Sequence, residues 1–352
     1  MERMQGKTAR AAAQSMSRRS FVAGLAGLGA LSILGGCSGS ESGSAGSSGA
    51  ASESGGSGAG APGKVVVGTL ATEDLLPLWA AQADGLFDQG GLEVEIVVFQ
   101  SATELIAGVS SGSVNMAMTD PMVSAGLAAS GTDVRLQWVT LGATAAQGRF
   151  GIMTGPSSGI SSLRDLADVP IGVGSNTILE YVMDVLMERA GVPADQVMVE
   201  ELQKLPVRFQ AMMSGDVAAA ALPGSLLALG EAKGCTTLAD DTAGENISQS
   251  VMIARVDFLD GAAGAATLSA LQAAWDEAVR AIDAAPEQYR AVLLQNANLS
   301  EDVAETYPIS EYPLVQRPTS AMVDPVLAWM DKKGYLAKPL SYNEQTGAFE
   351  TR

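Results

Sequence analysis

The sequence predicts an α/β protein of two similar lobes, each a parallel-rich sheet with helices on both faces, with a ligand cleft between the lobes. Three observations predict this fold class. Short apolar runs alternate with helical stretches, this order occurs twice, and the part that can fold, residues 64–352, is long enough for two domains. Strands that alternate with helices imply parallel pairing, because parallel neighbours need a crossover connection, usually a helix.

An internal repeat is the most specific of these observations. Residues 111–121 read Ser-Gly-Ser-Val-Asn-Met-Ala-Met-Thr-Asp-Pro, and residues 214–224 read Ser-Gly-Asp-Val-Ala-Ala-Ala-Ala-Leu-Pro-Gly. Each segment leads into a small-residue helix that ends in glycine, and 19 residues separate the segment's own glycine from that final glycine in both copies. We therefore expect the same strand and the same helix in each lobe.

The elements upstream of the two segments also correspond. In each lobe we expect a first strand, a helix and a second strand, namely strands 64–68 and 169–174, helices 73–87 and 176–190, and strands 92–99 and 196–200. From about Gly261 the chain is mainly helical, with amphipathic stretches at 271–285 and 323–332. We expect this tail to pack on the first lobe.

The N-terminal segment has the features of an export leader. Residues 16–22 read Met-Ser-Arg-Arg-Ser-Phe-Val and resemble the twin-arginine (Tat) signal, while Leu-Gly-Gly-Cys at 34–37 resembles a lipobox, whose cysteine is acylated. The 14-residue apolar stretch at 21–34 is shorter than the roughly 20 residues that span a bilayer. We expect a signal peptide at 1–36, lipid attachment at Cys37 and an extracytoplasmic protein anchored to the bacterial cell membrane. The alternative is a plain anchor helix with a chance cysteine.

The segment after the lipobox is predicted to be a tether, which we place at 37–63. Residues 38–63 contain only Gly, Ser, Ala, two Glu and one Pro, a composition that cannot form a core. The root-mean-square reach of such a chain is about 28 Å. Gly-Ala-Gly-Ala-Pro-Gly at 58–63 matches the nucleotide motif G-x-G-x-x-G, but it follows no predicted strand and opens no predicted helix, so we reject that interpretation.

Charge and residue usage exclude several classes of function. The net charge is −18, and it becomes −22 when residues 1–36, with five basic residues and one acid, are removed, so nucleic-acid binding is not expected. The chain has no histidine, which excludes Ser-His-Asp and Cys-His catalysis and His-ligated metal sites. We therefore read Ser157, in Gly-Pro-Ser-Ser-Gly at 155–159, as part of a turn, and Cys235 as a semi-buried apolar residue. We expect no catalytic residue, cofactor or metal.

The strand-end loops are where a ligand is expected. Ligands of open parallel sheets bind beyond the carboxyl ends of the strands, which lie here at 69–74 and 119–121 in the first lobe and at 174–177 and 222–225 in the second. Ser, Asn and Thr at 175–177 favour a helix start, whose free N–H groups suit an anionic or polar ligand. Helix capping without a ligand is the alternative. The candidate ligand-binding residues are Thr69, Thr72, Thr119, Asp120, Ser175, Asn176, Thr177 and Pro223.

Other charged residues near these loops have a plainer explanation. Glu73 and Asp74 could act as a general acid and base, but acids in a first helical turn also favour the helix dipole, and we prefer that interpretation. Arg208 could neutralise an anion, but we expect it to be solvated. Asp240 and Asp241 could bind a cation, but we expect a solvated loop there.

Four segments carry a resemblance to a known family. They are Leu-Pro-Leu-Trp-Ala-Ala-Gln-Ala-Asp-Gly-Leu-Phe at 76–87 with Gly-Leu-Glu-Val at 91–94, Ser-Gly-Ser-Val-Asn-Met-Ala at 111–117, Gly-Ile-Ser-Ser-Leu-Arg-Asp-Leu at 159–166, and Trp-Met at 329–330 with Lys-Gly-Tyr at 333–335. In this order, from residue 65 to about 342, the chain resembles the substrate-binding proteins of ABC importers. Within that class it is similar to the nitrate, sulfonate, taurine and thiamine-precursor type.

The resemblance implies a type II periplasmic-binding-protein fold and a hinged protein that closes on a small solute and delivers it to an ABC permease and its ATPase. It implies a first lobe at 64–148 plus 250–352, a second lobe at 149–249, and a monomer with no cofactor. Asn115 stands where the family often has aspartate, and Ala218 stands there in the second lobe. The strand-end loops hold no basic cluster, which weakens the case for a strictly anionic ligand and leaves neutral or aromatic solutes open.

Two other functions remain as alternatives. One is a lipid-anchored sensory or scaffold protein that binds a solute and serves no transporter. The other is an enzyme like the thiamine-pyrimidine synthases that resemble these binding proteins, but those rely on histidine, which this chain lacks. A transcription-regulator effector lobe is excluded by the export leader and by the lack of a DNA-binding helix pair.

Overall fold

The computed structural model describes residues 61–297, 299–300, 303 and 305–352. The predicted signal peptide, Cys37 and nearly all of the predicted tether lie outside these residues. The described residues belong to one structural unit, residues 57–352. In that unit, no helix of the described part is both long and apolar enough to cross a membrane.

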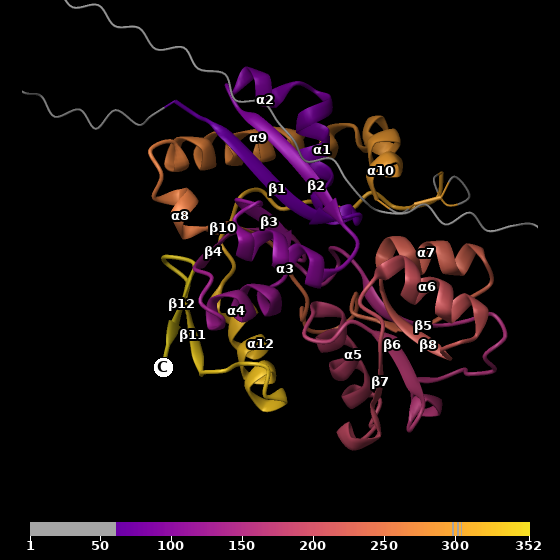
Figure 1. Cartoon of the computed structure of the whole chain (residues 1–352). Helices are drawn as coiled ribbons and strands as arrows, with labels where there is room; N and C mark the ends of the chain where they lie inside the picture. The colour runs from indigo at the N-terminus through magenta and orange to yellow at the C-terminus, as the bar shows by residue number, and fades with distance from the viewer. Residues whose placement is uncertain (1–60, 298, 301–302, 304) are drawn as a thin grey trace, which may run out of the picture. The chain divides into compact units, whose positions relative to one another are not determined.

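Seven strands form the first sheet, in the order β11-β12-β4-β10-β3-β1-β2 (Figure 1). Their bounds are β1 (Lys64–Leu70), β2 (Glu93–Phe99), β3 (Met116–Thr119), β4 (Val134–Leu141), β10 (Ser250–Arg255), β11 (Leu340–Asn343) and β12 (Ala348–Thr351). Strand β1 pairs in parallel with β2 and β3, and β10 runs antiparallel to β3 and β4. The sheet therefore combines strands from the start and the end of the described chain.

Five strands form the second sheet, in the order β7-β6-β8-β5-β9. Their bounds are β5 (Phe150–Thr154), β6 (Pro170–Val173), β7 (Met198–Glu201), β8 (Ala219–Pro223) and β9 (Thr236–Asp240). Strand β6 pairs in parallel with β7 and β8, and β5 runs antiparallel to β8 and β9. All five strands come from the middle of the chain, between two segments that contribute to the first sheet.

The internal repeat builds the parallel part of each sheet. The orders β2-β1-β3 and β7-β6-β8 are equivalent, and the same sequence of helices connects the strands. These helices are α1 (Leu76–Ala83), α3 (Ala102–Ser111) and α4 (Pro121–Ala129) beside the first sheet, and α5 (Ile178–Arg189), α6 (Leu205–Ser214) and α7 (Gly224–Ala232) beside the second. Helices α3 and α6 end at Gly112 and Gly215, with φ of 78° and 82°, a left-handed conformation that glycine adopts without strain.

Outside the repeat the strands run antiparallel, so both sheets are mixed. Residues 142–149 carry the chain from β4 to β5, and residues 241–249 carry it back from β9 to β10. Because β5 and β10 arrive from the other sheet, no crossover helix within the same sheet sets their direction. The parallel order that the repeat predicts therefore holds for three strands of each sheet.

The helix predicted at 73–87 is divided into three pieces. A 3₁₀ turn (Glu73–Leu75) precedes α1, and a short helix α2 (Leu86–Gln89) follows it. Gly85 separates the last two with a φ of 70°. A left-handed residue ends an α-helix, so the apolar periodicity continues through a break that only this glycine indicates.

The tail is helical with one exception. Its helices are α8 (Val256–Leu259), α9 (Gly264–Ala284), α10 (Arg290–Asn296) and α12 (Ser320–Lys333), with 3₁₀ turns at Pro286–Tyr289 and, earlier in the chain, at Leu163–Leu166 and Ala194–Gln196. The exception is the hairpin β11–β12, which joins the first sheet when Ala348 pairs with Arg135 of β4. The sequence analysis did not predict this hairpin.

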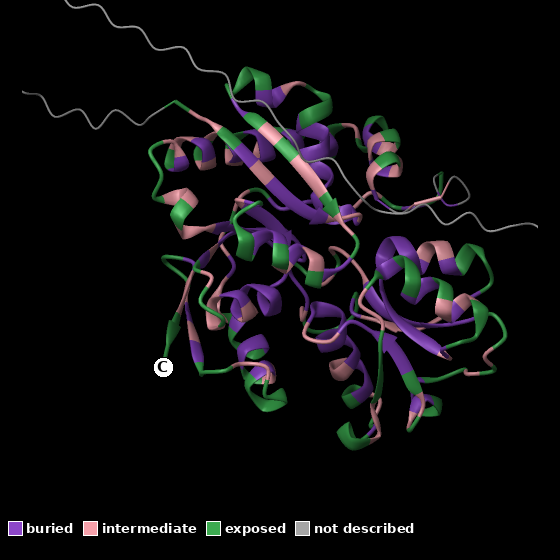
Figure 2. Ribbon diagram, in the orientation of Figure 1, coloured by how far each residue is buried: buried purple, intermediate pink, exposed green. Residues whose placement is uncertain are grey.

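Two apolar clusters hold these elements together. One lies on the face of the first sheet that α1 and α9 cover, and there the Trp138 and Trp275 rings meet edge to face at 5.7 Å. The other cluster covers the opposite face, beneath α3, α4 and α12, and continues around the second sheet. Figure 2 shows the buried residues along the central strands and the exposed residues on the outer surfaces of the helices. The first sheet is thus covered on both faces, as predicted.

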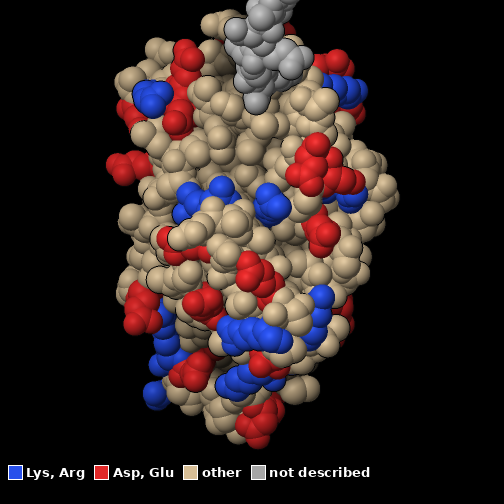
Figure 3. All heavy atoms as spheres, turned by 90° about the vertical axis from the view of Figure 1, so that its left-hand side faces the viewer, with Lys and Arg blue, Asp and Glu red and all other residues tan. Residues whose placement is uncertain are grey.

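The charged surface has no single dominant tract on the face that Figure 3 displays. Acidic and basic side chains are interspersed over this face, which carries α8 and the β11–β12 hairpin. Arg255 and Asp257 illustrate the pattern, because they form an ion pair of 2.5 Å between β10 and α8. This mixture differs from the continuous basic stripe that nucleic-acid binding requires.

Candidate functional site

A small cavity lies where the carboxyl ends of strands from both sheets meet. Its volume is about 60 Å³, which is room for on the order of five water-sized groups. Leu70 and Met118 line it from the first sheet, and Phe150 and Pro223 line it from the second. The polar lining residues are Thr72, Asp74, Thr119, Asp120, Thr177, Gln203, Arg208 and Ser250. Chain segments more than a hundred residues apart therefore build one mostly apolar site.

Five of the eight predicted ligand-binding residues line this cavity, and the other three do not. The five are Thr72, Thr119, Asp120, Thr177 and Pro223. Thr69 is fully buried in β1, where its Oγ1 donates to Leu70 O. Ser175 and Asn176 sit at the start of α5 but outside the lining. Ligand contact stays a prediction for all eight residues.

Asp120 lies between the two sheets at the end of β3. Its Oδ1 accepts a hydrogen bond of 2.7 Å from Val123 N, which caps α4, and its Oδ2 accepts one of 3.1 Å from Ile178 N, at the start of α5. Burial raises the pKa of this carboxyl to about 6, although both hydrogen bonds favour its ionised form. A single side chain therefore satisfies helix N–H groups on both sides of the cleft.

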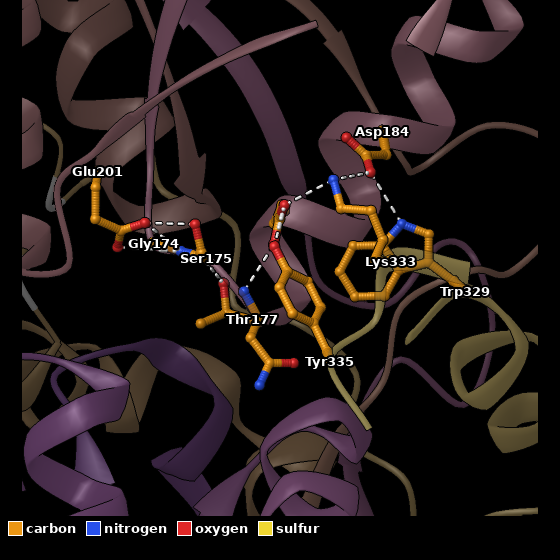
Figure 4. Close-up of polar contacts among 10 residues, drawn as sticks. Gly174, Ser175, Thr177, Asp184, Glu201, Trp329, Lys333 and Tyr335 are labelled. Carbon is orange, nitrogen blue, oxygen red and sulfur yellow. Dashed lines mark hydrogen bonds and ion pairs between the residues drawn. The ribbon is translucent and has the colours of Figure 1, made fainter. Parts of the chain in front are cut away.

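The N-terminus of α5 is surrounded by carboxylates of this chain (Figure 4). Ser175 N donates to both Glu201 oxygens at 3.3 Å, and Asn176 N donates to Glu180 Oε2 at 2.7 Å. Thr177 was expected to cap the helix with its side chain, but its Oγ1 donates to Gly174 O at 2.7 Å instead. The free N–H groups that were predicted to meet a ligand thus have internal partners.

Glu73 and Asp74 form a buried acidic pair at the end of β1. Tyr307 Oη donates to Glu73 Oε1 at 2.6 Å, Tyr312 Oη donates to Glu73 O at 2.9 Å, and Ser250 Oγ donates to Asp74 Oδ2 at 2.6 Å. Burial is the main reason why the pKa of both carboxyls is raised, and that of Asp74 reaches about 7. Both residues lie in the first turn of the 3₁₀ segment that leads into α1, where the sequence placed them, and both are buried.

Arg208 was expected to be solvated, and this expectation is wrong. Its side chain is 2% exposed, and it donates to three main-chain carbonyls: Leu202 O at 2.8 Å, Ala221 O at 3.0 Å and Gln203 O at 3.3 Å. Burial lowers its pKa to about 10. Gly174 makes room for it, since an added Cβ there would lie 2.8 Å from Arg208 Nη2. That glycine, next to a buried strand, was the available sequence signal.

Asp240 and Asp241 also differ from the predicted solvated loop. Asp240 Oδ2 accepts from Arg149 Nε at 2.7 Å, while Asp241 is 4% exposed and accepts from Phe150 N at 2.7 Å. Both residues therefore fasten the start of β5. Cys235 is buried against Met213, and burial raises its thiol pKa, so it fits the apolar role predicted for it.

The G-x-S-x-G segment forms a turn, as predicted, and Ser158 rather than Ser157 makes its side-chain contact, with Thr154. Within the described residues, no three carboxylate or thiol side chains gather in a way that could hold a metal ion. A larger hollow of about 670 Å³ lies between residues 144–149, α7 and residues 303–311, and none of the predicted ligand-binding residues lines it.

Residues 72–288 match the family described as NMT1/THI5 like. This match covers more than half of the chain, from just after β1 to the 3₁₀ turn that follows α9. Among curated proteins, none matches the sequence.

Solved structures with a similar fold are distant in sequence. The alkanesulfonate-binding protein SsuA from Xanthomonas axonopodis pv. citri, bound to MOPS, matches with a TM-score of 0.68 and 16% identity, over 80% of this chain and 96% of that one. The periplasmic aliphatic sulphonate-binding protein SsuA from Escherichia coli matches with a TM-score of 0.67 and 15% identity, over 83% and 93%. The periplasmic nitrate-binding protein NrtA from Synechocystis PCC 6803 matches with a TM-score of 0.64 and 14% identity, over 78% and 82%. These likenesses confirm the predicted type II periplasmic-binding-protein fold.

Proposed function

The chain belongs to the NMT1/THI5-like family, and on this premise we propose that it is an extracytoplasmic solute-binding protein that captures a small molecule and delivers it to an ABC importer. The observation that carries the proposal is the cavity between the two sheets, with lining residues from both. The fold neighbours named as sulfonate- and nitrate-binding proteins support the same class of function. Capture by closure needs a site that is lined from two lobes, and lining residues from both sheets support this proposal.

The proposed mechanism is hinge closure. The first lobe comprises residues 64–148 and 250–352, the second comprises residues 149–249, and the two segments that pass between the sheets form the hinge. These segments touch each other, since Asn246 Nδ2 donates to Gly142 O at 2.8 Å. Two short connections of this kind permit rotation of one lobe against the other while each sheet stays intact. No bond of the solute is made or broken, so we propose a binding protein and not an enzyme.

Attachment to the membrane is part of the proposal. A Tat-like signal peptide at 1–36 would direct export, Cys37 would carry lipid, and residues 37–63 would tether the folded unit near its permease and ATPase. Cys37→Ser should abolish labelling by a fatty-acid analogue and move the protein from the membrane fraction to the supernatant. Cys235→Ser is the matched control, because that thiol is buried and should leave labelling unchanged. Labelling that persists in Cys37→Ser contradicts the anchor.

The test of solute binding is a thermal-shift screen of the purified chain. The panel holds sulfonates, nitrate, bicarbonate, pyrimidines, amino acids and amines. A ligand at 100 times its Kd should stabilise the protein by about 2.7 kcal/mol, which raises Tm by a few degrees. A hit whose effect is lost in a cavity variant such as Thr119→Val supports the proposal. If cells that carry the importer do not take up the solute that binds, the sensory alternative is favoured.

A further inference from the structure

The N-terminus of α5 is the place beside the cavity where an anionic solute would be expected to bind. Helix N-termini beside a cleft bind anions because their N–H groups are unpaired and the helix dipole is positive there. At α5 these groups already donate to Asp120, Glu180 and Glu201, as described above. A sulfonate or nitrate would have to displace a carboxylate of the protein from each position. The start of α5 is therefore already occupied by negative charge.

The N-terminus of α7 also lies against a carboxylate of the protein. An added Cβ at Gly224, the first residue of α7, would lie 2.6 Å from Glu73 Oε1, so this carboxylate packs directly on the helix end. Ser225 lies against this buried carboxylate, and hydrogen bonds from its hydroxyl and its main-chain N–H favour the ionised form of Glu73 against the larger effect of burial, which raises the pKa. Two helices of the second sheet thus each receive a carboxylate from the first-sheet side.

The cavity is lined by more acidic than basic side chains. Asp74 and Asp120 line it, and Arg208 is the one basic residue among its lining residues. Arg208 donates three hydrogen bonds to main-chain carbonyls around it. Three of its N–H donors are therefore already used within the protein. Asp74, by contrast, has one hydrogen bond from another side chain, that of Ser250. An incoming group would find a carboxylate acceptor more accessible than a cationic donor.

Burial makes the ionised forms of the carboxyl groups of Asp74 and Asp120 unfavourable unless a positive charge lies nearby. Burial raises the pKa of Asp74 to about 7 and that of Asp120 to about 6, and the charges of Glu73 and Asp120 add to the shift of Asp74. A cation in the cavity would stabilise their ionised forms. Among the described residues, no three carboxylate or thiol side chains are arranged to hold a metal ion. The size of the cavity further restricts the cation to a few non-hydrogen atoms in the closed form.

We propose that the solute is a small organic cation, a short alkylammonium whose ammonium group donates to Asp74 and whose carbon atoms contact Leu70, Met118 and Phe150. This inference rests on the proposed function and adds the charge and size of the ligand. The apolar lining accepts the alkyl part, as in most small-molecule sites, and the carboxylates accept the charged end. An inorganic anion or a sulfonate would meet the carboxylates of Asp74 and Asp120 in the same place.

The experiment compares probes of equal size and different charge on the full chain. Propylamine, propanol, propanesulfonate and nitrate are titrated by calorimetry at pH 8. Propylamine should bind, propanol should bind at least tenfold more weakly, and the two anions should show no heat of binding. The propylamine affinity should fall as the pH is lowered through 7, because protonated Asp74 is neutral, and this profile needs no variant.

A variant pair sharpens the assignment. Asp74→Asn keeps the acceptor for Ser250 and should weaken propylamine binding at least tenfold at pH 8, while Asp331→Asn, at an exposed site in α12, should leave it unchanged. Binding of propanesulfonate or nitrate without binding of propylamine overturns the cation assignment and leaves solute binding intact. Absence of binding by all four probes also overturns it, and the broader screen then decides on solute binding separately.

Discussion

At the scale of single residues, Asp120 has two structural roles in one carboxyl group. It caps α4 through Val123 N and reaches across the cleft to Ile178 N. Asp120 is 6% exposed, and Val123 and Ile178 are also buried. Water therefore cannot readily replace the carboxylate as the partner of either N–H group. The carboxylate therefore contributes both to the stability of its own helix and to the approach of the two sheets.

Replacement of Asp120 should reveal both roles. Asp120→Ala leaves two buried N–H groups without a partner, so we expect the free energy of unfolding to fall by about 2–4 kcal/mol. Chemical denaturation at pH 7.5 measures this loss. Asp331→Ala, on the exposed face of α12, is the control and should change stability by less than about 0.5 kcal/mol. Equal effects of the two substitutions would contradict the capping role.

The buried carboxyl of Asp74 should make stability depend on pH. In the unfolded chain this group loses its proton near its ordinary value of 3.8, but in the folded protein it does so near 7. Between these values Asp74 holds its proton in the folded state and not in the unfolded chain, so its contribution to stability decreases as pH rises from about 4 to about 7. Glu73 and Asp120 face Asp74 and shift in the same direction, while Arg208 is the nearby cation of the cavity.

Asp74→Asn should reduce this pH dependence. We expect Tm of the wild type to fall more between pH 5 and pH 8 than Tm of the variant, because the amide has no proton to lose. Differential scanning calorimetry across this range gives the comparison, with Asp331→Asn as the control. If Tm of Asp74→Asn changes between pH 5 and pH 8 in the same way as Tm of the wild type, the raised pKa of Asp74 is refuted.

Sequence reasoning located part of the cavity at this scale. Thr119 and Asp120 were found because they follow an apolar strand of the repeat, where ligands of parallel sheets bind. Arg208 was missed because its burial depends on the carbonyl ends of two strands that meet only in the fold. The contact between Ser175 and Glu201 was not predictable for a similar reason: the sequence shows a helix start, but not that a carboxylate of a neighbouring strand accepts from its N–H group.

At the scale of elements, the end of α12 fastens the tail to α5. Lys333 Nζ lies 2.9 Å from Glu180 Oε1 and 2.9 Å from Asp184 Oδ2, and Trp329 Nε1 donates to the same Asp184 oxygen at 2.9 Å (Figure 4). Tyr335 Oη donates to Glu180 at 2.8 Å. Since Glu180 also accepts from Asn176 N, the network joins the tail, which belongs to the first sheet, to a helix start of the second.

Removal of the Lys333 charge should weaken this connection. The Glu180 side chain is 1% exposed, so Lys333→Met leaves a buried carboxylate with one cationic partner fewer. We expect the free energy of unfolding to fall by about 1–3 kcal/mol. Lys332→Met, at the exposed neighbouring position, is the matched control and should be nearly neutral. Similar losses in both variants would show that Lys333 acts only as a surface charge.

The elements themselves were predictable to different degrees. The repeat was readable because strand, helix and glycine recur at equal spacing, and the structure gives β2-β1-β3 and β7-β6-β8 the same order. The β11–β12 hairpin was missed because its strands have only four residues each. Gly85 interrupts a predicted helix with its positive φ. The sequence analysis missed this break because apolar periodicity does not reveal a single left-handed residue.

At the scale of the whole molecule, the proposed hinge closure assigns the bending to the two segments that pass between the sheets. Gly142 lies in the first segment with a φ of 86°, and an added Cβ would lie 2.3 Å from Ser248 O in the second. The backbones of the two segments are therefore in close contact at Gly142. A side chain at Gly142 would separate them and change the angle at which the sheets approach.

Gly142→Ala should therefore impair closure more than local stability. With a ligand from the screen, the radius of gyration of the wild type should decrease in small-angle scattering, and the decrease should be smaller in the variant. Gly131→Ala is the matched control, because Gly131 also has a positive φ, 92°, but no atom lies within 4 Å of an added Cβ. Both variants carry the cost of a left-handed alanine, so a difference between them isolates the contact between the segments. If the two variants compact as fully as the wild type, the hinge does not lie at this crossing.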